Sequence, residues 1–271
     1  MTISRGMRIA LVVFTLLALL AVYVPLALVV VSSFNTDKSF GWPPSGLTTH
    51  WWVTAWHSSG ARHALGVSVL VALAATALSL VLGTLAAMGL SRYDFFGRGS
   101  VNLMIILPIA LPGIVTGLAL NNAFRTWFGW QLGFGTIVVA HATFCIVTVF
   151  NNVQARLRRM NGSMEEASMD LGAGPLTTFR RVTLPQFRSA LLAGGLLAFG
   201  LSFDEIIVTT FTAGPHQQTL PLWIFNNLFR PNQAPVVNVV AAVLVVLSVV
   251  PIWAAQRISG TTGETVAAGA H

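Results

Sequence analysis

The chain has 271 residues, of which 55% are hydrophobic and only 8% are charged, and its mean hydropathy is +0.75. Because soluble domains carry about 25% charged residues, this composition excludes a soluble globular domain and indicates a membrane protein. The single cysteine, Cys145, excludes a disulfide framework and a cysteine-based metal site. The net charge of +7 does not indicate a nucleic-acid-binding protein, because the charges lie scattered between apolar stretches.

Six apolar stretches are each long enough to cross a bilayer core, which takes roughly 20 helical residues. Their residues do not alternate between apolar and polar as in a membrane barrel, so helices are expected. The sequence predicts an all-α membrane protein with a single transmembrane domain over residues 1–258 and a flexible cytoplasmic tail over 259–271. The six spans are expected at 9–31, 64–90, 101–120, 135–153, 190–211 and 236–255.

The first predicted span follows Arg5 and Arg8, and basic residues before an apolar run are also typical of a signal peptide. It is too long for one, and no small-residue cleavage site follows it, so a retained span is expected.

The third predicted span contains two prolines and two glycines that should break or kink it. Pro108 and Pro112 lack the N–H that helical hydrogen bonding needs, and Gly113 and Gly117 follow closely. Broken helices often line pathways in transporters, although kinks also serve simple packing. Pro112 is therefore a candidate for a substrate path.

A polar, helix-forming segment interrupts the apolar sequence between the predicted fourth and fifth spans. Ser163, with Glu166 three residues later, has the spacing of a capping box at a helix start. Gly172 falls where that short helix would need a left-handed terminator, and Pro175 suits the first position of a second helix. Leu184-Pro185 is expected to end the second helix. The segment predicts a compact helix–turn–helix element that suits docking to another protein.

The charged residues predict the orientation of the spans. Loops and ends on one side hold 11 Lys and Arg residues, and those on the other side hold 4. By the positive-inside rule, both termini and the polar segment lie in the cytoplasm. The external side carries a set of tryptophans typical of an interfacial belt, namely Trp42, Trp51, Trp52, Trp56, Trp127 and Trp130.

The polar segment reads Glu166-Ala167-Ser168, Gly172-Ala173 and Val182-Thr183-Leu184-Pro185. It resembles the hallmark of the permease subunits of bacterial ATP-binding-cassette importers: Glu-Ala-Ala, three residues, Gly, then a hydrophobic-x-Leu-Pro ending. Ser168 replaces the third family residue, Ala. In that family the segment is a coupling helix that lies in a groove of the ATPase subunit. The resemblance implies an ATPase-coupling set of Glu165, Glu166, Ala167, Ser168, Asp170, Gly172, Ala173, Leu184 and Pro185.

Further runs resemble the spermidine/putrescine permeases among these importers. They are Ala-His-Ala-Thr-Phe-Cys at 140–145, Leu-Ser-Phe-Asp-Glu at 201–205 and Leu-Pro-Leu-Trp-Ile at 220–224. Polyamine permeases tend to carry an acid after the second proline of the third span, where this chain has Gly113. That departure leaves open the same role with another cargo, such as an aminophosphonate, an opine or a ferric ion.

The resemblance implies a machine in the bacterial cytoplasmic membrane that works by alternating access. Its parts are a second permease, expected to be a different chain, a homodimeric cytoplasmic ATPase, an external solute-binding protein and membrane lipid, with no nucleic acid. This chain has no G-x-x-x-x-G-K-[ST] loop, and its only lysine, Lys38, is expected outside. It is therefore expected to be non-catalytic and to hold no cofactor, with ATP and Mg bound by the partner ATPase.

The ionisable residues inside the spans are candidates for the substrate path. Asp204 and Glu205 lie about 15 residues into the fifth span, roughly 22 Å from its cytoplasmic end. A carboxylate there costs about 2.5–3.5 kcal/mol on insertion, so it should face a cavity or a partner. Neighbouring helical residues diverge by roughly 100°, so one of the two is expected to face the path. The family pattern favours Asp204, and a purely structural pair is the alternative.

His141 in the fourth span is the remaining path candidate. It has two interpretations: a substrate contact or pH-sensitive group, or a buried, hydrogen-bonded histidine, which is the commoner case. His50, His57 and His63 have neither helical i, i+4 spacing nor a paired carboxylate, so no metal site is expected.

Two other classes of protein, a secondary transporter and an intramembrane enzyme, fit the sequence less well than the importer. A secondary transporter would leave the polar segment unexplained, and the six spans show no inverted repeat. An intramembrane enzyme would need a nucleophile–base or metal constellation that the scattered histidines do not form.

Overall fold

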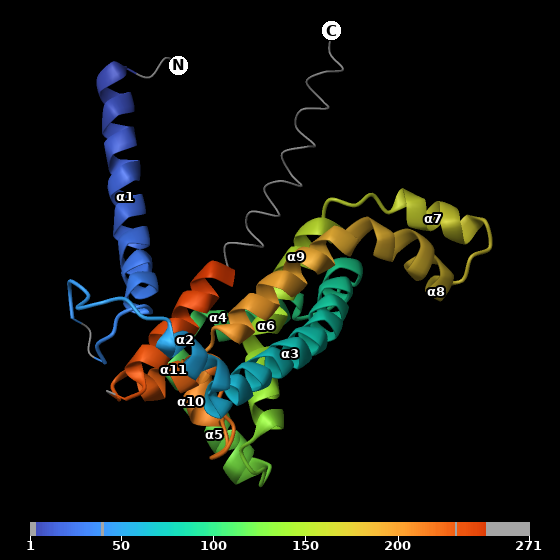
Figure 1. Ribbon diagram of the computed structural model, residues 1–271. Coiled ribbons are helices and arrows are strands. Elements are labelled where there is room, and N and C mark those ends of the chain that lie inside the picture. The colour runs from blue at the N-terminus through green and yellow to red at the C-terminus, as the bar shows by residue number, and fades with distance from the viewer. Residues whose placement is uncertain (1–3, 39–40, 231, 248–271) are drawn as a thin grey trace. The chain divides into compact units, whose positions relative to one another are not determined.

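The computed structural model describes residues 4–38, 41–230 and 232–247, and these are almost entirely helical (Figure 1). The only β pairing among them is an isolated antiparallel bridge between Asn35 and Leu47. The all-α prediction is therefore confirmed. The chain divides into two compact units, Met1–Arg62 with Ile224–His271, and His63–Trp223.

The first unit contains α1 (Arg5–Ser32), α2 (His50–His57) and the apolar helix Ala234–Leu247. The hydroxyl of Ser4 accepts the N–H of Met7 and so caps α1, which covers the predicted first span. The helix Ala234–Leu247 covers the described part of the predicted sixth span. The rest of that span and the predicted tail over 259–271 lie outside the described residues.

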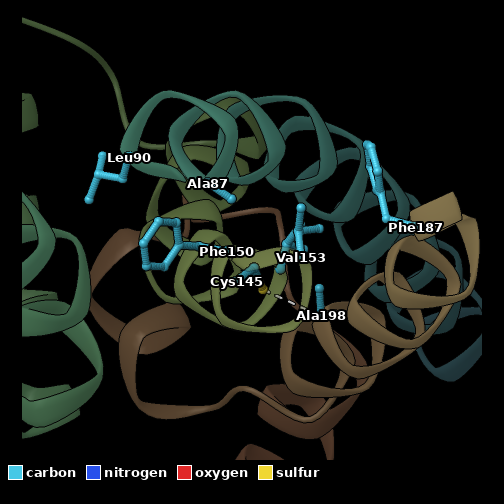
Figure 2. Close-up of a cluster of buried hydrophobic side chains, with 8 residues drawn as sticks. Ala87, Leu90, Cys145, Phe150, Val153, Phe187 and Ala198 are labelled. Atoms are coloured by element: carbon cyan, nitrogen blue, oxygen red, sulfur yellow. Dashed lines mark hydrogen bonds between the residues drawn. The ribbon is translucent and has the colours of Figure 1, made fainter. Parts of the chain in front are cut away.

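The centre of the second unit is built from α3 (Ser59–Arg92), α6 (Phe134–Leu157) and α9 (Leu184–Phe203). Small residues let these helices approach closely. A side chain at Gly83 would meet the carbonyl oxygen of Ile146 at 2.9 Å, and one at Gly194 would meet the Cα of Val149 at 3.3 Å. The apolar cluster between the helices, shown in Figure 2, consists of Ala87, Leu90, Cys145, Val149, Phe150, Val153, Phe187 and Ala198.

The predicted third span is broken in two. Helix α4 (Arg98–Ala110) is followed by α5 (Gly113–Asn122), which continues as the π turn η1 (Ala123–Trp127), and the two parts meet at 107°. Leu111 is extended, as the residue before a proline tends to be, so the break falls at Pro112 while Pro108 stays inside α4. The predicted break is confirmed, and a straight helix over 101–120 is excluded.

The predicted fifth span is also interrupted. Helix α9 ends at Phe203, and a short α10 (Ile207–Thr212) follows before α11 (Leu220–Leu228). Four helices within the described residues are long and apolar enough to span a membrane, and the bent α4–α5 pair would make five. The count of six spans stays a prediction.

Candidate functional site

The polar segment folds as two short helices, α7 (Ser163–Asp170) and α8 (Pro175–Thr178), which project beyond the ends of α3 and α9 (Figure 1). We call residues 163–185 the coupling loop. The capping box predicted for Ser163 is wrong, because Gly162 is the N-cap and its carbonyl accepts the N–H of Glu166 at 3.0 Å. Asn161 accounts for the shift: its side-chain oxygen accepts the N–H of Ser163 at 3.3 Å, so the helix begins one residue earlier.

The two turn residues predicted in the coupling loop are confirmed. Gly172 has φ +84°, a conformation that only glycine adopts without strain. The N–H of Gly172 donates to Met169 O at 2.8 Å and that of Ala173 to Ser168 O at 3.1 Å, which together form a Schellman motif. Pro175 occupies the first position of α8.

The prediction that Leu184-Pro185 ends the second helix is wrong. Helix α8 continues through a π turn, η2 (Phe179–Thr183), directly into α9, so residues Pro175–Phe203 form one helical piece of 29 residues. The N–H of Leu184 donates to Phe179 O, five residues earlier. This wider hydrogen-bond loop absorbs the irregularity that Pro185, without an N–H, introduces at the next residue.

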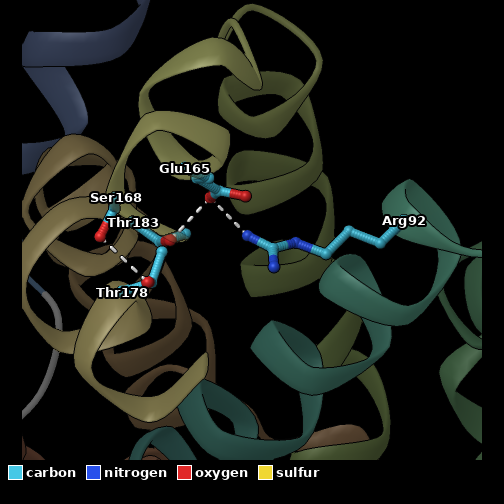
Figure 3. Close-up of polar contacts among 5 residues, drawn as sticks. All are labelled: Arg92, Glu165, Ser168, Thr178 and Thr183. Atoms are coloured by element: carbon cyan, nitrogen blue, oxygen red, sulfur yellow. Dashed lines mark hydrogen bonds and ion pairs between the residues drawn. The ribbon is translucent and has the colours of Figure 1, made fainter. Parts of the chain in front are cut away.

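One face of α7 is bonded to the chain's own helices (Figure 3). Glu165 Oε1 accepts hydrogen bonds from Arg92 Nη2 at 2.5 Å and from Thr183 Oγ1 at 2.6 Å. One turn along α7, the hydroxyls of Ser168 and Thr178 lie 3.1 Å apart. Residues three apart on a helix share a face, so Glu165 and Ser168 turn this face of α7 inward.

The rest of α7 and the turn after it are open to solvent. Glu166, Ala167, Asp170 and Gly172 are exposed, whereas Ala173 and Leu184 are half-buried. Apolar side chains lie among them: Met164, Met169 and Leu171 are 58%, 48% and 89% exposed. Pro185, at the start of α9, is exposed as well. An exposed surface that mixes a carboxylate with large apolar side chains is suited to a protein partner.

At the other end of α9, Asp204 and Glu205 lie in the link between α9 and α10. The expectation that both belong to a continuous helix is wrong. Glu205 is half-buried, and its Oε1 accepts the N–H of Val208 at 2.8 Å, so it supports the start of α10. Asp204 is exposed, and its carboxylate makes no hydrogen bond or ion pair with any described residue.

His141 joins the two sides of this link. It is fully buried, with Nδ1 2.8 Å from Ser202 Oγ at the end of α9 and Nε2 2.8 Å from Thr209 Oγ1 in α10. The hydroxyl of Thr209 donates to Glu205 O, so it accepts from Nε2–H, and Nδ1 accepts from Ser202. This is the geometry of a buried, hydrogen-bonded histidine with both ring nitrogens occupied.

Pro112 lies beside the same link, because α5 packs closely on α10. A side chain at Gly113 would meet Ile207 Cγ2 at 3.3 Å, and one at Gly117 would meet Phe211 Cδ2 at 2.7 Å. Asn121 Nδ2 donates to Phe211 O at 2.5 Å, which satisfies a carbonyl at the end of α10. The two helix breaks, at Leu111-Pro112 and at Asp204–Ile206, therefore lie side by side, and we call them the helix-break site.

The structure thus divides the candidates into two sites at opposite ends of α9, about 30 Å apart for its 20 residues at 1.5 Å each. Their bonding partners Arg92, Thr183, Ser202 and Thr209 were missed by sequence reasoning. In the sequence Arg92 is only one of the 11 basic residues that predict the orientation. Thr183 and Ser202 stand within the quoted motifs but carry no signal of these bonds, and no motif marks Thr209.

Comparison with known proteins identifies the family of most of the chain. Residues 79–260 match the family model described as "binding-protein-dependent transport system inner membrane component". The putrescine transport system permease protein PotI of Escherichia coli strain K12 is 36% identical over 246 residues, covering 86% of this chain and 84% of that protein. The spermidine/putrescine transport system permease protein PotC of the same strain is 34% identical over 247 residues, covering 89% and 92%.

A solved structure supports the fold. The crystal structure of a bacterial ABC transporter involved in the import of the acidic polysaccharide alginate superposes with a TM-score of 0.69 at 17% identity, covering 96% of this chain and 99% of that one. The resemblance seen in the sequence is confirmed. The chain belongs to the inner membrane components of binding-protein-dependent transport systems, the permease subunits of ATP-binding-cassette importers.

Proposed function

We propose that this permease carries a polyamine, putrescine or spermidine, across the bacterial cytoplasmic membrane. The observation that carries the cargo assignment is Asp204: an exposed carboxylate with no bond to the described residues, at a place where two helices are broken. A polyamine is a flexible multiple cation, and a carboxylate on its path replaces hydration that the cation loses. The names of the relatives PotI and PotC, both described as putrescine or spermidine/putrescine permeases, support the same cargo.

The chain works with partners that supply energy and solute. A homodimeric cytoplasmic ATPase, which binds ATP and Mg, docks on the coupling loop, and this chain itself is non-catalytic. A second, different permease completes the pathway, and an external binding protein delivers the solute. The bias of 11 to 4 in basic residues supports this orientation, with both termini and the coupling loop in the cytoplasm.

The described geometry supports alternating access. Closure of the ATPase displaces the coupling loop, and because Pro175–Phe203 is one helical piece, its far end at the helix-break site moves with it. Breaks in helices allow such movement, since their backbone groups are bonded by side chains rather than by a regular helix. Asp204 alternately faces the outside and the inside, while the hydrogen bonds of Glu205 and His141 hold the conformation of the link between α9 and α10.

The test is uptake of radiolabelled putrescine and spermidine by proteoliposomes that contain both permeases and the ATPase, with the binding protein outside. ATP-dependent uptake that falls about 10-fold or more in Asp204→Asn is expected, since one lost charge contact of about 1.4 kcal/mol is tenfold. Asp94→Asn, which removes an exposed carboxylate paired with Arg98, is the control and should leave uptake unchanged. ATP-dependent uptake of another solute, such as an aminophosphonate, would overturn the cargo, and uptake without the ATPase would overturn the importer.

A further inference from the structure

Glu165 stands one residue before the Glu-Ala-Ser stretch of the coupling loop, and its carboxylate does not face the surface that a partner would use. Its side chain is only 18% exposed, and its Oε1 is bonded to two residues of this same chain. Glu166 is exposed. Adjacent residues on a helix point about 100° apart, so the two carboxylates serve different neighbours.

The two donors to Glu165 come from the ends of two different long helices. Arg92 is the last residue of α3, and Thr183 is the last residue of η2, directly before α9. Thr183 is fully buried, and Arg92 is 38% exposed at its side chain. One carboxylate oxygen therefore ties α7 to both helices by charge-assisted hydrogen bonds, which are among the strong ones in proteins.

Behind these donors, α3 and α9 are joined by close packing. Ala87 and Leu90 of α3 and Phe187 of α9 belong to one buried cluster with residues of α6 (Figure 2). Close-packed interiors have low compressibility and pass on displacement. A movement of α7 that is held by Glu165 is thus passed to a rigid set of three helices.

We infer that Glu165, with Arg92 and Thr183, is the positioning link through which the movement of the coupling loop reaches α3 and α9. We call these three residues the carboxylate link. The inference rests on the proposed function, because it presupposes an ATPase that moves α7. It assigns to Glu165 a role inside this chain rather than a contact with the ATPase.

A distance measurement tests the link without reference to cargo. Cys145, the single cysteine, is fully buried, so spin labels attach selectively to cysteines introduced at Met164 on α7 and Leu196 on α9, which are 58% and 73% exposed. In the assembled complex the parent chain should keep one narrow distance distribution with and without ATP. With Glu165→Gln the distribution should shift or broaden when ATP is added.

Coupling gives the second readout. Glu165→Gln, Arg92→Gln and Thr183→Val should still co-purify with the ATPase and hydrolyse ATP, but import less putrescine per ATP by about 5-fold or more, the lower range of allosteric couplings. The double variant Glu165→Gln/Arg92→Gln should lose no more than either single variant, because both changes break one interaction. Asp94→Asn, from the exposed pair Asp94–Arg98, is the matched control and should behave like the parent.

Parental distances and parental import per ATP in Glu165→Gln would overturn the link, and so would loss of co-purification, which would make Glu165 a partner contact. A parent complex that hydrolyses ATP but imports no polyamine would instead show that the proposed cargo is wrong. The distance measurement would still test the carboxylate link in that case.

Discussion

Two pairs of neighbouring carboxylates lie near the two ends of α9, one pair in the coupling loop and one at the helix-break site. In each pair one carboxylate is bonded to the chain itself and the other is exposed. In the coupling loop, Glu165 is bonded to Arg92 and Thr183, whereas Glu166 is exposed. At the helix-break site, Glu205 is bonded to the N–H of Val208, whereas Asp204 is exposed. One member of each pair holds the chain's own structure, and the other is left for a partner or a solute.

The pairs differ in how their neighbours are held in place. Glu165 and Glu166 lie on a regular helix, whose geometry alone separates their directions. Asp204 and Glu205 lie outside helices, and the polar contacts of His141, Ser202 and Thr209 fix their link. Loss of the His141 side chain should therefore lower stability more than loss of any single side chain of the coupling loop.

The largest effect on stability is expected from His141→Leu. This change leaves the buried hydroxyl of Ser202 without its histidine partner and removes one of the two hydrogen bonds of Thr209, which keeps its bond to Glu205 O. A buried polar group that loses its partner costs about 1–3 kcal/mol. The thermal unfolding temperature of the purified complex in detergent should fall clearly. His57→Leu, at an exposed histidine, is the control. An unchanged unfolding temperature in His141→Leu would show that the link is held by something else.

Gly172→Val should have the next largest effect, confined to the coupling loop. A β-branched residue at φ +84° costs roughly 1–2 kcal/mol and displaces the turn after α7. We expect weaker binding of the ATPase, measured by co-purification, and lower ATP-driven uptake. Gly174→Ala serves as the control, since Gly174 has φ −70° and open space around it. Equal behaviour of the two variants would mean that the turn does not direct α7.

Glu165→Gln and Glu166→Gln compare the two members of the first pair directly. The loss of the charged hydrogen bonds of Glu165 should lower the free energy of unfolding by about 1–2 kcal/mol, because the pair with Arg92 is partly exposed. The change at exposed Glu166 should stay within about 0.5 kcal/mol. Affinity for the ATPase should show the opposite order. If the same variant had the larger effect on both the free energy of unfolding and the affinity for the ATPase, the division of roles between Glu165 and Glu166 would be wrong.

Glu205→Gln and Asp204→Asn compare the two carboxylates of the helix-break site in the same way. Of the variants considered, these two should have the smallest effect on stability. A glutamine at 205 still accepts the N–H of Val208 but loses the favourable charge near the start of α10, worth about 0.3–1 kcal/mol. Asp204→Asn should leave the unfolding temperature unchanged and reduce uptake. Reduced uptake in Glu205→Gln alone would reverse the roles of the two carboxylates.

Much of this fold could be read from the sequence because its signals are local. The apolar runs predicted α1, α3 and α6, and the proline and glycine positions predicted the break at Pro112, the turn at Gly172 and the start of α8 at Pro175. Each of these depends on the conformational preference of one residue or on a run of apolar residues, so no distant contact had to be known.

The features that were missed depend on contacts between distant residues. No proline or glycine marks the end of α9 at Phe203, and it takes His141, 61 residues from Ser202, to bond across the link. Likewise Arg92 lies 73 residues from Glu165, so the inward direction of that carboxylate has no local signal. The capping box at Ser163 failed for a local reason, because Asn161-Gly162 competes for the same helix end.

The π turn at Phe179–Thr183 makes the number of residues in this stretch a geometric parameter of the permease. A π turn holds one residue more than α-helical hydrogen bonding requires. If the same residues were wound as a regular α-helix without the π turn, everything before them would be rotated by about 100° and displaced by about 1.5 Å. Glu165 would then leave Arg92, and Glu166 would face another direction. A change that straightened this stretch at constant length would keep every motif residue and still misdirect the surface offered to the ATPase.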